Sequence, residues 1–264
     1  MLASLLGGFI ELGKKPIYIV PALIVMILNF GILLLSIDNY FKFFYDVFVF
    51  GEVAESPLIE MPFFLFTTYG FDLVLIGITM FISLGLSLYL LYVYSSLING
   101  TEKNIGKAMS QTIGKLGEIV GLTFFVFFAM FLYGTIGYLL FVLSTMVEGI
   151  GIIFLLIFLL WILLGIYFYV KLAFTPILMA TEREKLKPAL AATWKWSSGK
   201  TIKIAIFLAL IGGIAGILNT FFSTLGDATG VNFLAVLILL IGLGISNAYY
   251  NIAFIKYFLN TKQK

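Results

Sequence analysis

Inside the apolar stretches of this sequence, the side chains that could do chemistry are polar and uncharged. Four asparagines lie there, and the last two are spaced i, i+4, so they share one helix face with a neighbouring tyrosine. An amide in hydrocarbon is costly without a hydrogen-bond partner, so we expect each to face protein or a wet cavity. They are candidates either for lining a cavity or for bonding helices together at about 1 kcal/mol per bond. These residues are Asn29, Asn219, Asn247, Asn251 and Tyr250.

The residue types on which most enzymes depend are missing. The chain contains no His and no Cys, which removes the commonest general base, the commonest metal ligand and all thiolate chemistry. A membrane enzyme would have to use acids such as Glu118, Glu182 and Glu184, and no paired-carboxylate motif or metal-ligand cluster accompanies them. We therefore predict a protein that is not an enzyme and that has no cofactor and no metal.

Residues 183–203 contain a high proportion of basic residues together with two tryptophans. Their positive charges can hold anionic headgroups of the inner leaflet at about 1 kcal/mol each, although the orientation rule for membrane proteins explains the same excess. Tryptophan is favoured at the depth of the headgroups. The net charge of +3 gives no indication of nucleic-acid binding. The predicted headgroup residues are Arg183, Lys185, Lys187, Lys195, Lys200 and Lys203, and the predicted interfacial anchors are Trp194 and Trp196.

The elements that position these residues are membrane-spanning helices. The chain is 62% hydrophobic and 11% charged, whereas soluble domains are about 45–50% apolar and about 25% charged. Six runs exceed the roughly 20 apolar residues that cross a bilayer, and they are apolar all round instead of alternating as barrel strands do. We predict one all-α transmembrane domain over residues 1–264, a six-span helical bundle. The spans lie near 16–37, 73–98, 119–143, 150–170, 204–225 and 231–255.

The charges predict the orientation. Every basic residue except Lys42 lies in one set of segments, and most acids lie in the set that alternates with it. Lys and Arg concentrate in cytoplasmic loops, so both termini are predicted to be cytoplasmic in a cell membrane. Asp72 and Lys171 lie at predicted span edges, where we expect interfacial anchors instead of a proton relay. The basic segments are 1–15, 99–118, 171–203 and 256–264, and the acidic segments are 38–72, 144–149 and 226–230.

A short amphipathic element precedes each outward-going span, near 4–14, 105–118 and 188–200. The match is closest between the second and third copies, where Ala108 and Thr112 correspond to Ala189 and Thr193. The unit would be an amphipathic helix, a glycine, a span outward and a span back, which gives three hairpins. Internal repeats are common in transporter folds, although amphipathic helices also precede spans without duplication.

Glycines mark two of the predicted spans. Gly212 and Gly216 have small-xxx-small spacing in the fifth span, and Gly242 and Gly244 lie in the sixth. Such residues allow helices to approach closely, either within the bundle or between two copies of the chain.

Several short motifs of this chain carry a family resemblance. They are Phe174-Thr175-Pro176-Ile177-Leu178, Glu182, Ala189-Leu190, Thr193-Trp194, Ser197-Ser198-Gly199-Lys200, Lys14-Lys15-Pro16 and Pro21. In these motifs the chain is similar to poorly characterised prokaryotic six-span membrane proteins, which resemble the membrane domain attached to some glycerophosphoryl diester phosphodiesterases. Thr193 stands where the family often has Ser. The resemblance implies the six-span architecture and not the phosphodiesterase activity, which needs a soluble domain with metal-binding carboxylates and His.

Two functions follow from these patterns. The first is transport-like handling of lipids or solutes in a cavity lined by the Asn and Tyr residues. The alternative is a scaffold or assembly factor for other membrane proteins. The expected partners are membrane lipids, together with another membrane protein or a second copy of the chain, and not nucleic acid.

Overall fold

The computed structural model describes residues 1–44, 61–146, 150–182 and 184–262, and these form helices and short links without any strand. The predicted all-α class is confirmed. The helices are α1 (Leu2–Lys14), α2 (Ile19–Phe44), α3 (Met61–Ile98), α4 (Ile105–Ile113), α5 (Leu116–Met146), α6 (Gly151–Leu172), α7 (Thr175–Glu182), α8 (Leu186–Ser197), α9 (Thr201–Asp227) and α10 (Asn232–Lys262), with a 3-10 turn at Pro16–Tyr18.

Six stretches of the described chain are helical, long and apolar enough to cross a membrane, which defines a polytopic helical membrane protein. Each contains nearly all of one predicted span. The fourth extends through α7, past a break after Leu172 that the sequence pattern did not predict. The six are Pro16–Lys42, Gly70–Ile98, Leu116–Ser144, Gly151–Glu182, Thr201–Asp227 and Asn232–Lys262.

Proline and glycine set several helix boundaries. Pro62 and Pro176 each lie in the first turn of a helix, where the missing N–H leaves no bond unmade. Gly100 and Gly199 follow α3 and α8 with φ of +75°, a conformation that glycine adopts without the steric cost of a Cβ. Gly100, Pro176 and Gly199 each lie where a long helix adjoins a short one.

The order of one short and two long helices recurs three times. The hairpins α2–α3, α5–α6 and α9–α10 pack as pairs, and α1, α4 and α8 precede them. In α4 and α8 the corresponding residues are buried, and the hydroxyls of Thr112 and Thr193 donate to the carbonyls of Ala108 and Ala189, both at 2.8 Å. The predicted correspondence therefore holds in structure, and α7 is an additional element between the second and third units.

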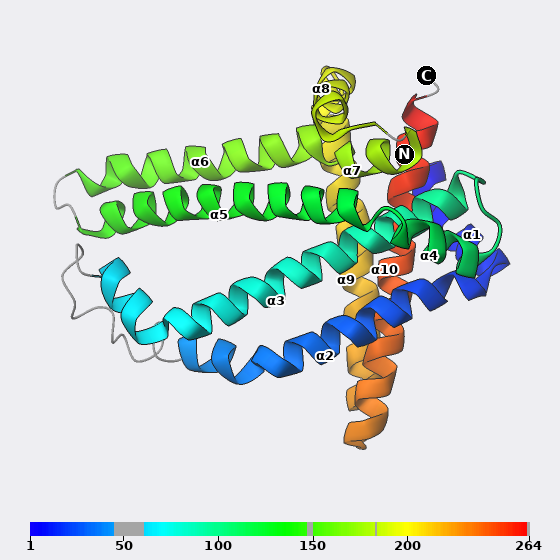
Figure 1. Ribbon diagram of the computed structural model, residues 1–264, viewed down its shortest axis with the longest axis horizontal. Coiled ribbons are helices and arrows are strands. Elements are labelled where there is room, and N and C mark those ends of the chain that lie inside the picture. The colour runs from blue at the N-terminus through cyan, green and yellow to red at the C-terminus, as the bar shows by residue number, and fades with distance from the viewer. Residues whose placement is uncertain (45–60, 147–149, 183, 263–264) are drawn as a thin grey trace.

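The short helices gather at one end of the molecule, together with the first residues of α1 and the last turns of α10 (Figure 1). We call this the basic end. From it α2–α3 and α5–α6 extend in a similar direction, whereas α9–α10 runs across them. α10 nevertheless contacts α1, α2 and α3, and α9 contacts α6. The three hairpins thus meet at the basic end and diverge toward their far ends.

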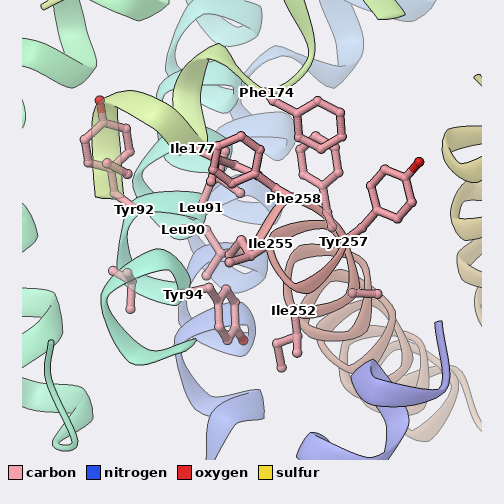
Figure 2. Close-up of a cluster of buried hydrophobic side chains, with 14 of the residues drawn as sticks. Leu90, Leu91, Tyr92, Tyr94, Phe174, Ile177, Ile252, Ile255, Tyr257 and Phe258 are labelled. Carbon is pink, nitrogen blue, oxygen red and sulfur yellow. The ribbon is translucent and has the colours of Figure 1, made fainter. Parts of the chain in front are cut away.

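The best-packed region lies at the basic end, and we call it the hub. Phe174 is at its centre, with ring centroids 4.7 Å from Phe254, 5.6 Å from Phe258 and 5.0 Å from Trp196. By contrast, no residue is buried in the most apolar stretch of the fourth span. Tertiary packing is therefore concentrated at one end. The hub residues labelled in Figure 2 are Leu90, Leu91, Tyr92, Tyr94, Phe174, Ile177, Ile252, Ile255, Tyr257 and Phe258.

Candidate functional site

Asn247 and Asn251 of α10 bond mainly within their own helix. Asn247 Nδ2 donates to the carbonyl of Leu243 at 2.9 Å and also contacts the sulfur of Met26 in α2 at 3.4 Å. Asn251 Nδ2 donates to the carbonyl of Asn247 at 2.8 Å. Asn247 therefore links α10 to α2, whereas the bond of Asn251 stays within α10.

Asn29 and Asn219 have buried Oδ1 atoms without a hydrogen-bond partner among the described residues. Asn29 lies one turn beyond Met26, so it is near the crossing of α2 and α10. Neither residue lines the cavity between α6, α9 and α10 or the cavity between α1, the end of α3 and α10. Of the predicted set, Asn247 contacts a second helix and Tyr250 lines a cavity.

That cavity has a volume of about 360 Å³, lies between α6, α9 and α10, and is partly open to the surface of the bundle. Its walls are mostly apolar, and its polar groups are the hydroxyls of Tyr169 and Tyr250, which interact with each other. Gly212 leaves its wall open, since nothing lies within 4 Å of the place a Cβ would take. We call this the lateral cavity. It is lined by Ile166, Tyr169, Val170, Ala205, Leu208, Ala209, Gly212 and Tyr250.

The glycines of the last two spans divide into two groups. A Cβ at Gly242 would lie 2.2 Å from Phe222 Cβ, and one at Gly244 would lie 2.5 Å from a methyl carbon of Leu23. These two glycines therefore allow the close contacts predicted within the bundle. Gly212 and Gly216 meet nothing within 4 Å, so the small-xxx-small pair of α9 faces open space.

A second cavity, also about 360 Å³, lies at the basic end between α1, the end of α3 and α10. The carboxylate of Glu11 in α1 lies 2.8 Å from Nζ of Lys256 in α10. It also lies 3.3 Å from Nζ of Lys15, which follows α1. Lys256 Nζ also donates to the carbonyl of Gly7 at 3.1 Å. The charges in this cavity thus bind the two ends of the described chain to each other.

This ion pair predicts a pH-dependent stability. The hydrogen bond from Lys256, with a further contribution from Lys15, lowers the pKa of Glu11 below its ordinary value of 4.5. A carboxyl whose pKa is lowered in the folded state stabilises the fold fully when the pH is above the pKa of the unfolded state. This stabilisation is lost as the pH falls through the pKa of the folded state. We expect Glu11→Gln to melt below the wild type at neutral pH, and the difference to shrink as the pH falls below 4.5.

Thermal unfolding of both proteins between pH 3 and 7 measures this effect. Glu184→Gln is the matched control, because Glu184 forms no ion pair in the part of the chain that the structure describes. A melting difference for Glu11→Gln that stays constant across the whole range would contradict the assignment.

The predicted headgroup lysines are mostly free of protein contacts. Lys185, Lys187, Lys195 and Lys203 are exposed. Lys200 instead turns toward α10, where its Nζ lies 3.4 Å from the carbonyl of Thr261 and 5.2 Å from the ring centre of Trp196. Arg183 lies outside the described residues.

The two predicted anchor tryptophans occupy different environments. Trp194 is exposed and packs against Tyr167 and Phe168 of α6. Trp196 is half-buried and packs into the hub against Phe174 and Phe258. The exposure of the two side chains therefore identifies Trp194, and not Trp196, as the one free to meet lipid.

Sequence reasoning missed a polar cluster at the far end of the first hairpin. Asp72 is buried, accepts a hydrogen bond from Asn39 Nδ2 at 2.5 Å and lies 3.7 Å from Lys42 Nζ. The signal was present, since Asn39 and Lys42 are spaced i, i+3 on one helix face and Lys42 is the one basic residue of the acidic segments. This cluster ties α2 to α3.

The candidate acids are not brought together. Glu182 pairs with Lys262, whereas Glu118 is exposed in the first turn of α5. Among the described residues there is no group of three or more acids placed to hold a metal ion.

The chain matches no protein-family model, no curated protein and no solved structure. The family resemblance of its short motifs therefore stays a prediction, and function is argued from the site alone.

Proposed function

We propose that this protein is a non-catalytic, lipid-handling membrane protein that takes an acyl chain into the lateral cavity. The observation that carries the proposal is the cavity itself. Its volume lies within the roughly 300–1,000 Å³ range of ligand sites, its walls are apolar, and two hydroxyls are its polar groups. An apolar cavity disfavours water and accepts hydrocarbon, and this one is partly open to the surface of the bundle, so an acyl chain can enter it.

The charge pattern supports an orientation for this function. The basic end carries the exposed lysines of α8 and the first turn of α9, so it faces the cytoplasm in a cell membrane. The lateral cavity lies near that end, because it is formed by the last turns of α6 and the first turns of α9. The proposed ligand is therefore an inner-leaflet lipid.

Filling the cavity tests the proposal. Gly212→Leu places a side chain into the lateral cavity, and we expect it to reduce the lipid that stays bound to the purified protein. Gly216→Leu is the matched control, since it lies one turn further along α9, also faces open space and does not line the cavity. Native mass spectrometry in mild detergent measures the retained lipid. Equal retention by the wild type and both variants would refute the proposal.

The open glycines of α9 support an alternative, a scaffold that associates through this helix. Gly212 and Gly216 have the spacing at which transmembrane helices pack closely, and no helix of the described chain covers them. In that case both Leu variants would break an oligomer while lipid retention stays unchanged. The same two variants thus distinguish the two functions.

A further inference from the structure

Lys171 is a buried cation in the last turn of α6, with only 4% of its surface exposed. Its Nζ donates to Ser198 Oγ at 3.0 Å, and that hydroxyl in turn donates to the carbonyl of Trp194 at 2.9 Å. No carboxylate of the described chain lies within 4 Å of this ammonium, and every ion pair among the described residues involves another lysine. A buried charge without a counter-charge is costly, so an acceptor is missing.

Neighbouring groups compensate for part of the charge. The ring centres of Trp194 and Tyr167 lie 5.2 Å and 5.6 Å from Nζ, within the range of cation–π attraction. The negative end of the α6 dipole adds to this, since Lys171 is in the last turn. An ammonium has three donors, however, and the hydroxyl of Ser198 accepts only one of them.

The surroundings indicate what the missing acceptor is. Ser198 and Trp194 are exposed although Lys171 is not, so a ligand can reach the site from the surface of the bundle. Tryptophan beside a basic residue at the end of a membrane span is typical of headgroup depth. The first turn of the 27-residue helix α9, which has no side-chain cap, begins three residues after Ser198 and adds positive potential.

We propose that Lys171 holds the phosphate of an anionic membrane lipid beside Ser198, with Trp194 and Tyr167 packed around the ammonium. Phosphate oxygens accept charge-assisted hydrogen bonds from an ammonium. The site goes beyond the proposed function. Tyr167 and Lys171 share one face of α6, whereas Ile166, Tyr169 and Val170 face the lateral cavity. Lys200 does not take part in this site, since its side chain points to α10.

Lipid preference tests this site. The full-length protein is placed in nanodiscs with equal phosphatidylglycerol and phosphatidylcholine, and the lipids that remain bound after release are measured by native mass spectrometry. We expect the wild type to retain phosphatidylglycerol preferentially, and Lys171→Met to lower that preference at least tenfold. One surface charge supplies only about fivefold, so Lys195→Met, which removes an exposed lysine of α8, should lower it by no more than that.

The remaining arms separate the alternatives. Lys171→Met should stay folded, because an apolar chain replaces an unpaired buried charge, and its melting temperature checks this. Lys171→Arg should keep the preference, since it keeps the positive charge. Equal losses for Lys171→Met and Lys195→Met would overturn the site in favour of diffuse charge. Displacement of phosphatidylglycerol by millimolar inorganic phosphate would overturn the lipid as the source of the phosphate. Gly212→Leu should leave this preference unchanged, so failure here is distinguishable from failure of the lateral cavity.

Discussion

Replacing Phe174 by Ala is expected to lower the free energy of unfolding by about 3 kcal/mol. The ring is completely buried and packs against Phe254, Phe258 and Trp196, which come from α10 and α8. Removing it leaves a cavity where the second and third hairpins meet, and close-packed neighbours refill such a space only in part. The loss therefore affects the contact between hairpins and not the helices themselves.

Phe131→Ala is the matched control for Phe174→Ala. Phe131 lies in α5 with 61% of its surface exposed, so lipid replaces the contacts that its ring loses. Thermal unfolding in the same detergent compares the two variants. Similar melting temperatures for both would mean that the hub does not hold the hairpins together.

Alanine substitutions at two glycines are expected to change stability in opposite directions. Gly242→Ala places a Cβ 2.2 Å from Phe222 Cβ, so α9 and α10 have to separate, and overpacking of this kind costs about 1–3 kcal/mol. Gly213→Ala meets nothing within 4 Å, and in a helix interior alanine is favoured over glycine by about 0.5–1 kcal/mol.

Melting temperatures of the two Ala variants check the pair. We expect Gly242→Ala below the wild type and Gly213→Ala at or above it. The composition of the two proteins is the same, so the comparison isolates the local packing of α9 against α10. Destabilisation of equal size at both positions would contradict the described contact.

The spans were predictable because a bilayer requires a run of about 20 apolar residues, whatever the tertiary structure. The hub was not predictable. Tyr94 lies in a segment that is apolar all round, so periodicity does not distinguish the face that packs from the face that meets lipid. In a soluble helix the polar face would have identified the buried one. Phe174 lies outside the predicted spans, in the basic segment 171–203, where no pattern marked it as buried.

The polar positions were predictable as residues and not as contacts. Asn247 was identified from its place in a span, yet its partners, Leu243 and Met26, depend on the crossing of α10 with α2. Trp194 and Trp196 are two residues apart, so helical geometry places them on different faces, and only the packing of α8 shows which one enters the hub. Lys171 was expected to be an anchor, and its burial between α6 and α8 followed from no sequence pattern.

The docking of α1 on α10 has a consequence for synthesis. Gly8 lets α1 approach so closely that a Cβ there would lie 2.9 Å from the ring of Tyr249, and Ser4 accepts a hydrogen bond from Asn260 at 3.2 Å. The ribosome makes α1 long before α10, so α1 lacks this packing partner until the third hairpin has been made. Final assembly therefore follows the emergence of α10. The first two hairpins can pack against each other before then, because α3 contacts α5 directly.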